Sequence, residues 1–287
     1  MRIFVTGGAG FIGTHLCKKL SSIHKVTVYD NFSNSNKENF PILKNLTLIV
    51  GDILDNSKLI DSMKNHDIVI HLAAKTDVID SINNPENTFQ TNVQGTQNII
   101  DSCKFHNISK IIVTSSASVY QSSDKSIGET NTTKPSSPYG QSKLSMEKIT
   151  TESKMNYSIL RLFNVYGTDQ SSGVIANFKQ NISENIPITI FGDGEAIRDF
   201  IHIDDVVDAI ILSIKSKSGI YNIASGHGTS IINLAKLMMQ LYEKNSEIIY
   251  SSPRTGELLY SVSDIRKSQN ELKFHPKISL NEGLKIL

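Results

Sequence analysis

Two residues near the middle of the chain have the types and spacing to move a proton at an alcohol. Tyr139 and Lys143 lie four positions apart in SSPYGQSK, so a helix there places both on one face. A phenol with a pKa of about 10 is a poor base at neutral pH, but a nearby ammonium stabilises the phenolate. The pair alone also suits a solvated helix face, so its interpretation depends on its neighbours.

A run of small hydroxyl residues ends the predicted strand that precedes this pair. The run is TSSASVY, residues 114–120. Open parallel sheets bind ligands outside the carboxyl ends of their strands. A hydroxyl at such an end can hydrogen-bond a reacting C–O group.

A glycine-rich stretch near the N-terminus predicts a nucleotide-binding turn. In GGAGFIG the glycines are Gly7, Gly8, Gly10 and Gly13, between an apolar run and a helical pattern. Gly7 can adopt a backbone angle closed to other residues, Gly10 allows close approach to a diphosphate, and Gly13 allows close helix packing. The helix N-terminus then faces the diphosphate.

Asp30 predicts which dinucleotide the turn binds. It ends the second predicted strand, twenty positions after Gly10. A carboxylate there accepts hydrogen bonds from both hydroxyls of the adenine ribose and repels a 2′-phosphate, which favours NAD over NADP. With the hydroxyl run and the Tyr139/Lys143 pair, it predicts hydride transfer at an alcohol carbon.

Short apolar runs alternate with helical patterns along the first half of the chain. The predicted strands are residues 2–6, 25–30, 46–52, 67–74 and 110–116. Ser137 and Pro138 predict the start of the helix that carries Tyr139. This alternation predicts an α/β fold with a Rossmann-type doubly wound parallel sheet.

The composition narrows the class of protein. Lys and Arg total 29 and Asp and Glu total 28, so neither nucleic acid nor a membrane surface is an expected partner. Cys17 and Cys103 lack metal-ligand spacing, so we expect two buried hydrophobes and no metal site. No signal-peptide pattern and no membrane-spanning window is visible. We expect a soluble, cytoplasmic protein.

Over nearly its whole length the chain resembles the extended short-chain dehydrogenase/reductase family. Within that family it is similar to the NAD-dependent nucleotide-sugar epimerases and dehydratases, and most of all to the UDP-glucose 4-epimerase group. The motifs that carry the resemblance are VTGGAGFIG, YDNFSNS, GDI, HLAA, NVQGT, SSASVY, SSPYGQSK, LRLFNVYG, FGDGEAIRDFIHIDD, YNIASG and RTGELLYSVSD.

The resemblance implies a role for each matching residue, and none for Gly8 in the glycine turn. Tyr139 is the expected acid/base, Lys143 holds the nicotinamide ribose and tunes the tyrosine, and Ser116 is the catalytic hydroxyl. The implied cofactor-binding residues are Gly7, Gly10, Phe11, Ile12 and Gly13 at the diphosphate, Asp30, Asn31, Asn34 and Ser35 at the adenosine half, Asp52 and Ile53 beside adenine, and Leu72, Ala73, Ala74, Asn92 and Ser115 nearby.

A UDP-sugar is the substrate that the resemblance implies. Ser116 and Asn164 would contact it, Arg198 and Arg254 would hold its two phosphates, and Phe191 would stack near its base. Arginine suits the phosphates because its planar fork binds their oxygens in pairs. Ser261 lies where small residues tend to admit a 2-acetamido group, so we hypothesise that UDP-GlcNAc and UDP-GalNAc fit as well as UDP-Glc and UDP-Gal.

The implied reaction is 4-epimerisation of a UDP-hexose through a transient 4-keto sugar, with NAD kept bound. Dehydratases and decarboxylases of the group usually carry an acidic residue where this chain has Ala117 and Ser118, which favours the epimerases. A 4,6-dehydratase or decarboxylase is the alternative. A non-catalytic NAD-binding protein is the alternative from another class.

The change of pattern after residue 167 predicts a second, smaller α/β lobe interleaved with the first. We expect a NAD-binding Rossmann domain at 1–168 plus about 200–219, and a nucleotide-sugar-binding lobe at about 169–199 plus 220–287. The resemblance also implies a homodimer formed through helices at about 85–105 and 139–154. Residues 121–137 read equally as a plain surface loop or as a loop over an active-site mouth.

Overall fold

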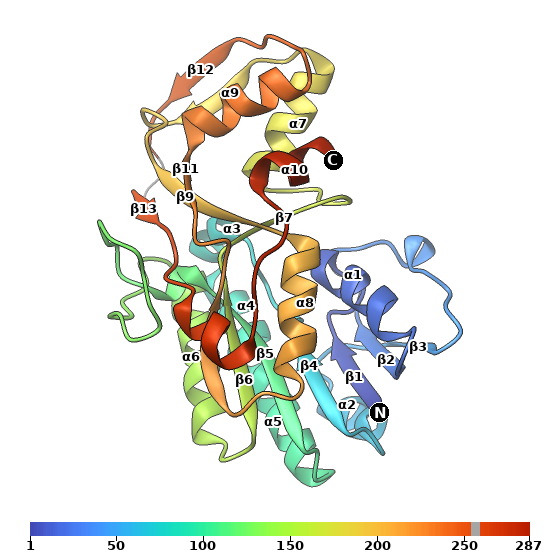
Figure 1. The fold of residues 1–287 in the computed structure, drawn as a ribbon. Coiled ribbons are helices and arrows are strands. Elements are labelled where there is room, and N and C mark those ends of the chain that lie inside the picture. The colour runs from blue at the N-terminus through green and yellow to red at the C-terminus, as the bar shows by residue number, and fades with distance from the viewer. Residues whose placement is uncertain (254–258) are drawn as a thin grey trace. The chain divides into compact units, whose positions relative to one another are not determined.

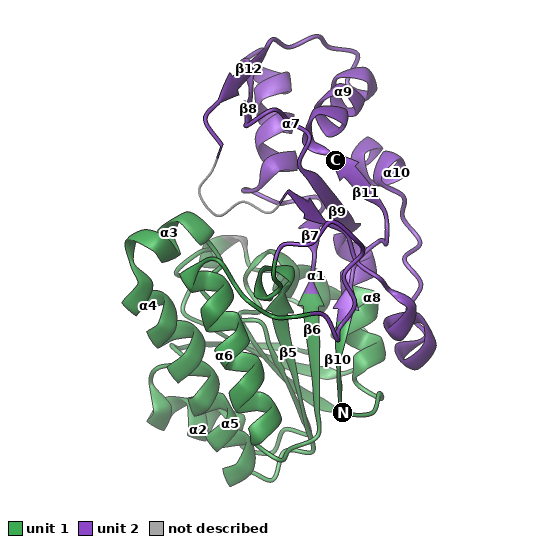
Figure 2. Cartoon of the chain, turned by 90° about the vertical axis from the view of Figure 1, so that its left-hand side faces the viewer, with its two compact units in different colours: residues 1–121, 132–161, 207–221 green, residues 122–131, 162–206, 222–287 purple. Residues whose placement is uncertain are grey.

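The computed structural model describes residues 1–253 and 259–287 of the chain (Figure 1). It divides into two compact units (Figure 2). Unit 1 comprises Met1–Gln121, Thr132–Arg161 and Val207–Tyr221, and unit 2 comprises Ser122–Asn131, Leu162–Val206 and Asn222–Leu287. Which domain binds which ligand stays a prediction.

The strands follow the apolar runs of the sequence. They are β1 (Arg2–Thr6), β2 (Lys25–Asp30), β3 (Leu46–Val50), β4 (Ile68–His71), β5 (Lys110–Ser116), β6 (Tyr157–Leu162), β7 (Asn164–Tyr166), β8 (Ile188–Phe191), β9 (Ile197–His202), β10 (Gly219–Ile223), β11 (Gly228–Ser230), β12 (Ile248–Ser251) and β13 (Tyr260–Ser261).

Helices connect these strands. They are α1 (Phe11–Leu20), α2 (Asn56–Met63), α3 (Val78–Asn83), α4 (Pro85–Phe89), α5 (Gly95–Phe105), α6 (Pro138–Glu152), α7 (Val174–Glu184), α8 (Ile203–Ser213), α9 (Ile231–Leu241) and α10 (Leu280–Lys285), with short 3₁₀ turns η1 (Lys37–Asn39) and η3 (Ala117–Val119) and π-helical turns η2 (Gln90–Gln94) and η4 (Ser268–Leu272).

The seven-stranded sheet has the order β10-β6-β5-β4-β1-β2-β3. The pairs β1–β2, β2–β3, β1–β4 and β4–β5 are parallel. Strand order reverses at β1, and ligands of such sheets bind where it reverses, outside the carboxyl ends of the strands. The predicted Rossmann-type doubly wound sheet is confirmed.

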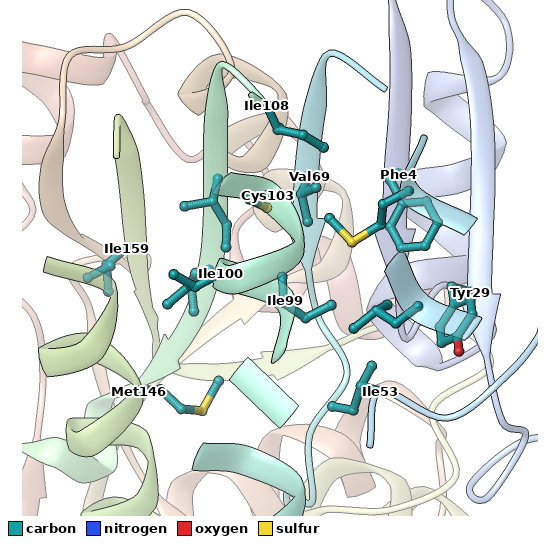
Figure 3. Close-up of a cluster of buried hydrophobic side chains, with 14 residues drawn as sticks. Phe4, Tyr29, Ile53, Val69, Ile99, Ile100, Cys103, Ile108, Met146 and Ile159 are labelled. Atoms are coloured by element: carbon teal, nitrogen blue, oxygen red, sulfur yellow. The ribbon is translucent and has the colours of Figure 1, made fainter. Parts of the chain in front are cut away.

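Helices cover both faces of this sheet. Figures 1 and 2 show α2, α5 and α6 on one face and α1 and α8 on the other. A cluster of buried side chains fills the space under α2, α5 and α6 (Figure 3), and it includes Phe4, Val69, Ile99, Ile111 and Met146. Each such side chain stabilises the fold by roughly 1.5–3 kcal/mol. This packing fixes the positions of β4 and β5, and so of the residues at their carboxyl ends.

Unit 2 is built around β9. This strand pairs with β11, β13 and β7, and β8 pairs with β12 in a separate two-stranded sheet. Buried side chains of α7, α9 and α10 pack with both sheets in one core, which includes Phe178, Ile190, Phe200, Leu234 and Leu284.

The predicted elements differ from the observed ones mainly at their ends. The strand predicted at 46–52 ends at Val50, because the chain turns at residues 53–54, where the Asp52 carboxylate accepts the N–H of Leu54. The strand predicted at 67–74 ends at His71. The helix predicted at 85–105 is α4, η2 and α5 in succession. Within the described ranges, no helix is long and apolar enough to span a membrane.

Candidate active site

The glycine turn after β1 leaves no room for side chains. Gly7 has a φ of +69°, and a Cβ on it would lie 2.5 Å from the backbone N of Ala73. A Cβ on Gly13 would overlap the carbonyl oxygen of Gly7. The expectation that Gly8 has no role is wrong, because a Cβ there would lie 2.8 Å from both γ-methyl groups of Val28. The turn therefore needs three of its four glycines for packing alone.

The N-terminus of α1 follows this turn directly. Gly10 is its N-cap, and no side chain in the described parts of the chain caps it. The first N–H groups of the helix, at Phe11, Ile12 and Gly13, have no partner within the helix. Their partial positive charge suits a diphosphate.

Asp30 lies at the end of β2 with its carboxylate fixed by the backbone. One oxygen accepts the N–H of Ala9 at 2.9 Å and the other accepts that of Phe32 at 2.8 Å. A carboxylate has about four acceptor sites, so two remain for the hydroxyls of a ribose. The first of these bonds also ties Asp30 to the glycine turn.

The other residues predicted to bind the adenosine half of NAD differ in their burial and in their contacts. Asn31 donates to the Asp52 carboxylate at 2.8 Å, which places these two side by side, while Asn34 is exposed and Ser35 half-buried. Ile53 is 5 % exposed and packs in the core, where a Cβ on Gly95 would overlap it. The side chain of Ile53 therefore contacts protein atoms, and its carbonyl accepts the Asn98 amide at 2.9 Å.

The segment that follows β4, residues 72–75, is hydrogen-bonded to the end of β1 and to Asn92. The N–H of Leu72 donates to the carbonyl of Thr6 at 3.0 Å, and Ala73 and Ala74 follow it half-buried. Asn92 is fully buried, accepts the N–H of Lys75 at 2.7 Å and donates to the Ser142 hydroxyl at 2.9 Å. Asn92 thus binds the segment to α6, and its contact with a cofactor stays a prediction.

Helix α6 positions the candidate acid/base. Ser137 is its N-cap, with its hydroxyl accepting the N–H of Gly140, and Pro138 is its first residue, as predicted. The Ser81 hydroxyl accepts the N–H of Tyr139 at 3.1 Å. The backbone of Tyr139 is therefore held from α3 as well as by its own helix.

Tyr139, Lys143 and Ser116 meet at the carboxyl end of β5. The Ser116 hydroxyl lies close enough to the Tyr139 phenol to lower its pKa, and it donates to the Ser118 hydroxyl at 3.2 Å. The Lys143 ammonium donates to the carbonyl of Thr114 at 3.0 Å and lies 6.0 Å from the centre of the Tyr139 ring. These side chains can hold a C–O group between a hydroxyl and a phenol.

Burial acts on the pKa of both titrating groups. It raises the pKa of the Tyr139 phenol, and the nearby Ser116 hydroxyl partly offsets this. It lowers the pKa of the Lys143 ammonium to about 8, against the charge of Glu147, which raises it. Lys143 is therefore mostly protonated at neutral pH, while Tyr139 needs a further positive charge before it can become a phenolate.

The Ser115 hydroxyl is bound to Glu147 rather than to Ser116, Tyr139 or Lys143. Ser115 is 4 % exposed and donates to a carboxylate oxygen of Glu147 at 2.5 Å. Glu147 in turn binds Arg161 on β6. Sequence reasoning missed Glu147 and Arg161, although Glu147 follows Lys143 by four positions and so shares its helix face.

His71 is a second buried residue that the sequence pattern did not single out. Its Nε2 lies 2.9 Å from the Thr96 hydroxyl, which itself donates to the carbonyl of Asn92. Nε2 therefore carries the proton, and Nδ1 accepts from the Thr6 hydroxyl at 2.7 Å. Burial, with Lys143 adding to it, lowers the pKa of His71 to about 3. This neutral imidazole links the strand before the glycine turn to Asn92.

In unit 2, three of the predicted substrate residues lie on β9 or on strands that pair with it. Arg198 lies on this strand, and Ser261 pairs with it in the register of β13. The Asn164 amide on β7 donates to the carbonyl of Asp199 at 3.1 Å. Phe191 ends β8 in the two-stranded sheet, and Arg254 lies outside the described residues. Ser261 is buried at 4 % exposure.

Asp199 organises the strand ends around β9. Its fully buried carboxylate accepts the N–H and the hydroxyl of Ser225 at 2.8 and 2.6 Å, the N–H of Gly226 at 2.9 Å and that of Ser263 at 3.2 Å. Burial raises the pKa of this carboxyl against these hydrogen bonds. Asp199 was not predicted as a site residue, because its partners are far away in sequence.

Known proteins match the chain over almost all of its length. It is 36 % identical to a putative UDP-glucose 4-epimerase of Methanocaldococcus jannaschii, over 99 % of this chain and 96 % of that protein. A crystal structure of UDP-glucose 4-epimerase with UDP-glucose from Thermotoga maritima superimposes with a TM-score of 0.94 at 34 % identity, covering 100 % and 97 % of the two chains.

A second solved structure carries the expected cofactor. UDP-glucuronic acid 4-epimerase from Bacillus cereus, in complex with a UDP-sugar analogue and NAD, superimposes with a TM-score of 0.95 at 29 % identity, covering 100 % and 97 % of the chains. The family model described as "NAD dependent epimerase/dehydratase family" matches residues 3–224, more than half of the chain. The chain therefore belongs to the NAD-dependent epimerase/dehydratase family of enzymes.

Proposed function

We propose that this protein interconverts the C4 epimers of a UDP-hexose, through a 4-keto sugar, with a NAD that stays bound. One observation carries the proposal. A hydroxyl, a phenol and a buried ammonium, from Ser116, Tyr139 and Lys143, meet at the end of β5. Strand β5 is separated only by β4 from β1, which ends in the glycine turn.

The residues of unit 1 fit NAD. The glycine turn is too tight for a Cβ at Gly7 or Gly13, which brings bare backbone to the N-terminus of α1. Asp30 keeps acceptor sites for ribose hydroxyls and would repel a 2′-phosphate. Bound NAD would supply the hydride acceptor, and then the hydride donor, for the sugar carbon.

The chain's own residues handle the proton. Tyr139 as phenolate accepts the proton of the sugar 4-hydroxyl and later gives it back. Lys143, protonated at neutral pH, supplies positive charge beside the phenolate. Ser116 hydrogen-bonds the same oxygen through the cycle and so fixes the reacting C–O group.

The substrate is proposed to be held mainly by its diphosphate. Arg198 and Asn164 on β9 and β7 are proposed to bind it together with Arg254. Binding energy from the diphosphate leaves the sugar loosely held, which a turning 4-keto intermediate requires. Ser261 is the residue on which we base the proposal that N-acetylated hexoses also fit.

The segment after Ser116 supports epimerisation over elimination of water. Ala117 and Ser118 provide no carboxylate, and the N–H of Ser118 is used to bind the Ser116 hydroxyl at 3.1 Å. A 4-keto-6-deoxy sugar or released carbon dioxide would instead identify a dehydratase or a decarboxylase.

The variant Tyr139→Phe tests the proposal against a non-catalytic NAD-binding protein. It removes one oxygen, so we expect a loss of kcat of at least about a hundredfold, with the NAD content of the purified protein unchanged. Tyr157→Phe is the matched control, since Tyr157 lies half-buried on β6 outside the proposed site. Equal activity of wild type and Tyr139→Phe would contradict the proposed role.

A further inference from the structure

One buried ion pair holds both ends of the segment that carries Ser116. At one end, the Ser115 hydroxyl donates to Oε1 of Glu147 at 2.5 Å. At the other end, a terminal nitrogen of Arg161 donates to the Tyr120 hydroxyl at 2.8 Å, and the guanidinium lies 4.7 Å from the centre of the Tyr120 ring. Glu147 and Arg161 bind each other through two hydrogen bonds of 2.9 and 2.6 Å.

This arrangement is buried throughout. Glu147 is 3 % exposed and Arg161 4 %. Two buried charges are no more stabilising than an apolar pair of the same volume, because desolvation offsets their attraction. What such a pair does provide is a fixed relative orientation, because a bidentate carboxylate–guanidinium pair has one favoured geometry. The pair therefore fixes positions more than it adds stability.

The same helix face binds β5 at three successive residues. Tyr139, Lys143 and Glu147 recur every four positions on α6, so they line one face. The three ties are the hydrogen bond from Lys143 to Thr114, the hydrogen bond from Ser115 to Glu147 and the proximity of the Ser116 hydroxyl to the Tyr139 phenol, whose pKa it lowers. Gly140 adds a close contact, because a Cβ there would overlap the carbonyl oxygen of Ser118. A shift of the segment by one residue would break every tie.

We propose that Glu147 and Arg161 form a positioning pair, which clamps Ser115 and Tyr120 and thereby holds the Ser116 hydroxyl against Tyr139. This inference rests on the proposed function, in which Ser116 and Tyr139 act on the sugar oxygen. Neither Glu147 nor Arg161 is assigned a contact with substrate or cofactor. Ser115 accordingly acts through Glu147 rather than through NAD.

Hydroxyl deletions test the clamp without leaving a buried charge unpaired. Ser115→Ala and Tyr120→Phe each remove one oxygen and keep the ion pair. The matched controls are Ser158→Ala and Tyr221→Phe, which remove equally buried hydroxyls that bind residues 213–217. For each variant, kcat and KM for UDP-glucose and UDP-GlcNAc, NAD content and Tm are measured.

The clamp predicts a specific split between these variants. Ser115→Ala and Tyr120→Phe lose between about ten- and a hundredfold in kcat, as small misplacements of reacting groups do, with KM and NAD content unchanged. Ser158→Ala and Tyr221→Phe keep kcat within about twofold at a similar loss of Tm. A kcat that merely follows Tm in all four variants, or a loss of NAD from Ser115→Ala, would overturn the proposal.

A second measurement separates this inference from the proposed function. The Tyr139 phenol is titrated by ultraviolet difference absorbance in the NAD-loaded protein, against Tyr139→Phe. The nearby Ser116 hydroxyl lowers the pKa of Tyr139, so displacing it through Ser115→Ala raises that pKa, whereas Ser158→Ala leaves it unchanged. If wild type converts no UDP-sugar, the proposed function fails while this shift still supports the clamp. An active wild type without the shift contradicts the clamp alone.

Discussion

At the scale of single residues, the charge of Lys143 is the property with the most direct consequence. Its ammonium is buried beside the Tyr139 ring, and burial lowers its pKa to about 8. The protonated form therefore dominates below that pH and is lost above it. Since only the ammonium stabilises a phenolate, the reaction should depend on the protonated form.

This predicts a fall of kcat as the pH rises through about 8. In Lys143→Arg the guanidinium keeps its charge at this pH. The activity that remains in this variant should therefore show no fall of kcat near pH 8. Lys110→Arg is the control, because Lys110 is also buried with a pKa lowered to about 8 but binds Ser213 and Ser216 at the end of α8. An alkaline limb that persists in Lys143→Arg would assign it to another group.

The sequence could predict the residues with chemistry but not their supports. Tyr139 and Lys143 share a helix face that spacing alone reveals, and a hydroxyl run marks the end of β5. Glu147 and Arg161 also lie close in sequence, but nothing in their spacing shows that α6 and β6 bring them together. For Ser115, the family pattern suggested a cofactor contact, whereas the structure gives its hydroxyl to Glu147.

At the scale of elements, continuous apolar runs predicted the central strands well. Strands β1, β2 and β5 have the bounds that the sequence predicts, because burial on both faces leaves an unbroken apolar signal. Strands β7, β11 and β13 have only two or three residues. Their structure depends on pairing with β9, which is distant in sequence, so local patterns could not reveal them.

Asp199 on β9 hydrogen-bonds the segments that follow β10 and β13, so we expect the stability of unit 2 to depend on it. In Asp199→Asn, one acceptor oxygen becomes an amide that faces N–H groups, so we expect the free energy of unfolding to fall by about 2–4 kcal/mol. Asp193→Asn is the control, because its exposed carboxylate accepts a single N–H, that of Glu195. Urea unfolding gives both values, and a loss below about 0.5 kcal/mol in Asp199→Asn would contradict this role.

At the scale of the whole molecule, the assembly stays a prediction from the family resemblance. We expect a homodimer that forms through α4, η2 and α5 together with α6, the helices observed at the positions the resemblance implies. Light scattering of the purified protein should then give twice the monomer mass. A monomer at every concentration measured would contradict it.

Under the proposed function, bound NAD would be reduced and reoxidised within each turnover on a UDP-hexose. The most direct test incubates the purified protein, without added NAD, with UDP-glucose, UDP-galactose, UDP-GlcNAc and UDP-glucuronic acid in turn, and follows the products by NMR. We predict that the C4 epimer of at least one hexose or N-acetylhexosamine substrate appears, with no net NADH. Conversion of none of these sugars by NAD-loaded protein, or a dehydrated or decarboxylated product, would contradict the account.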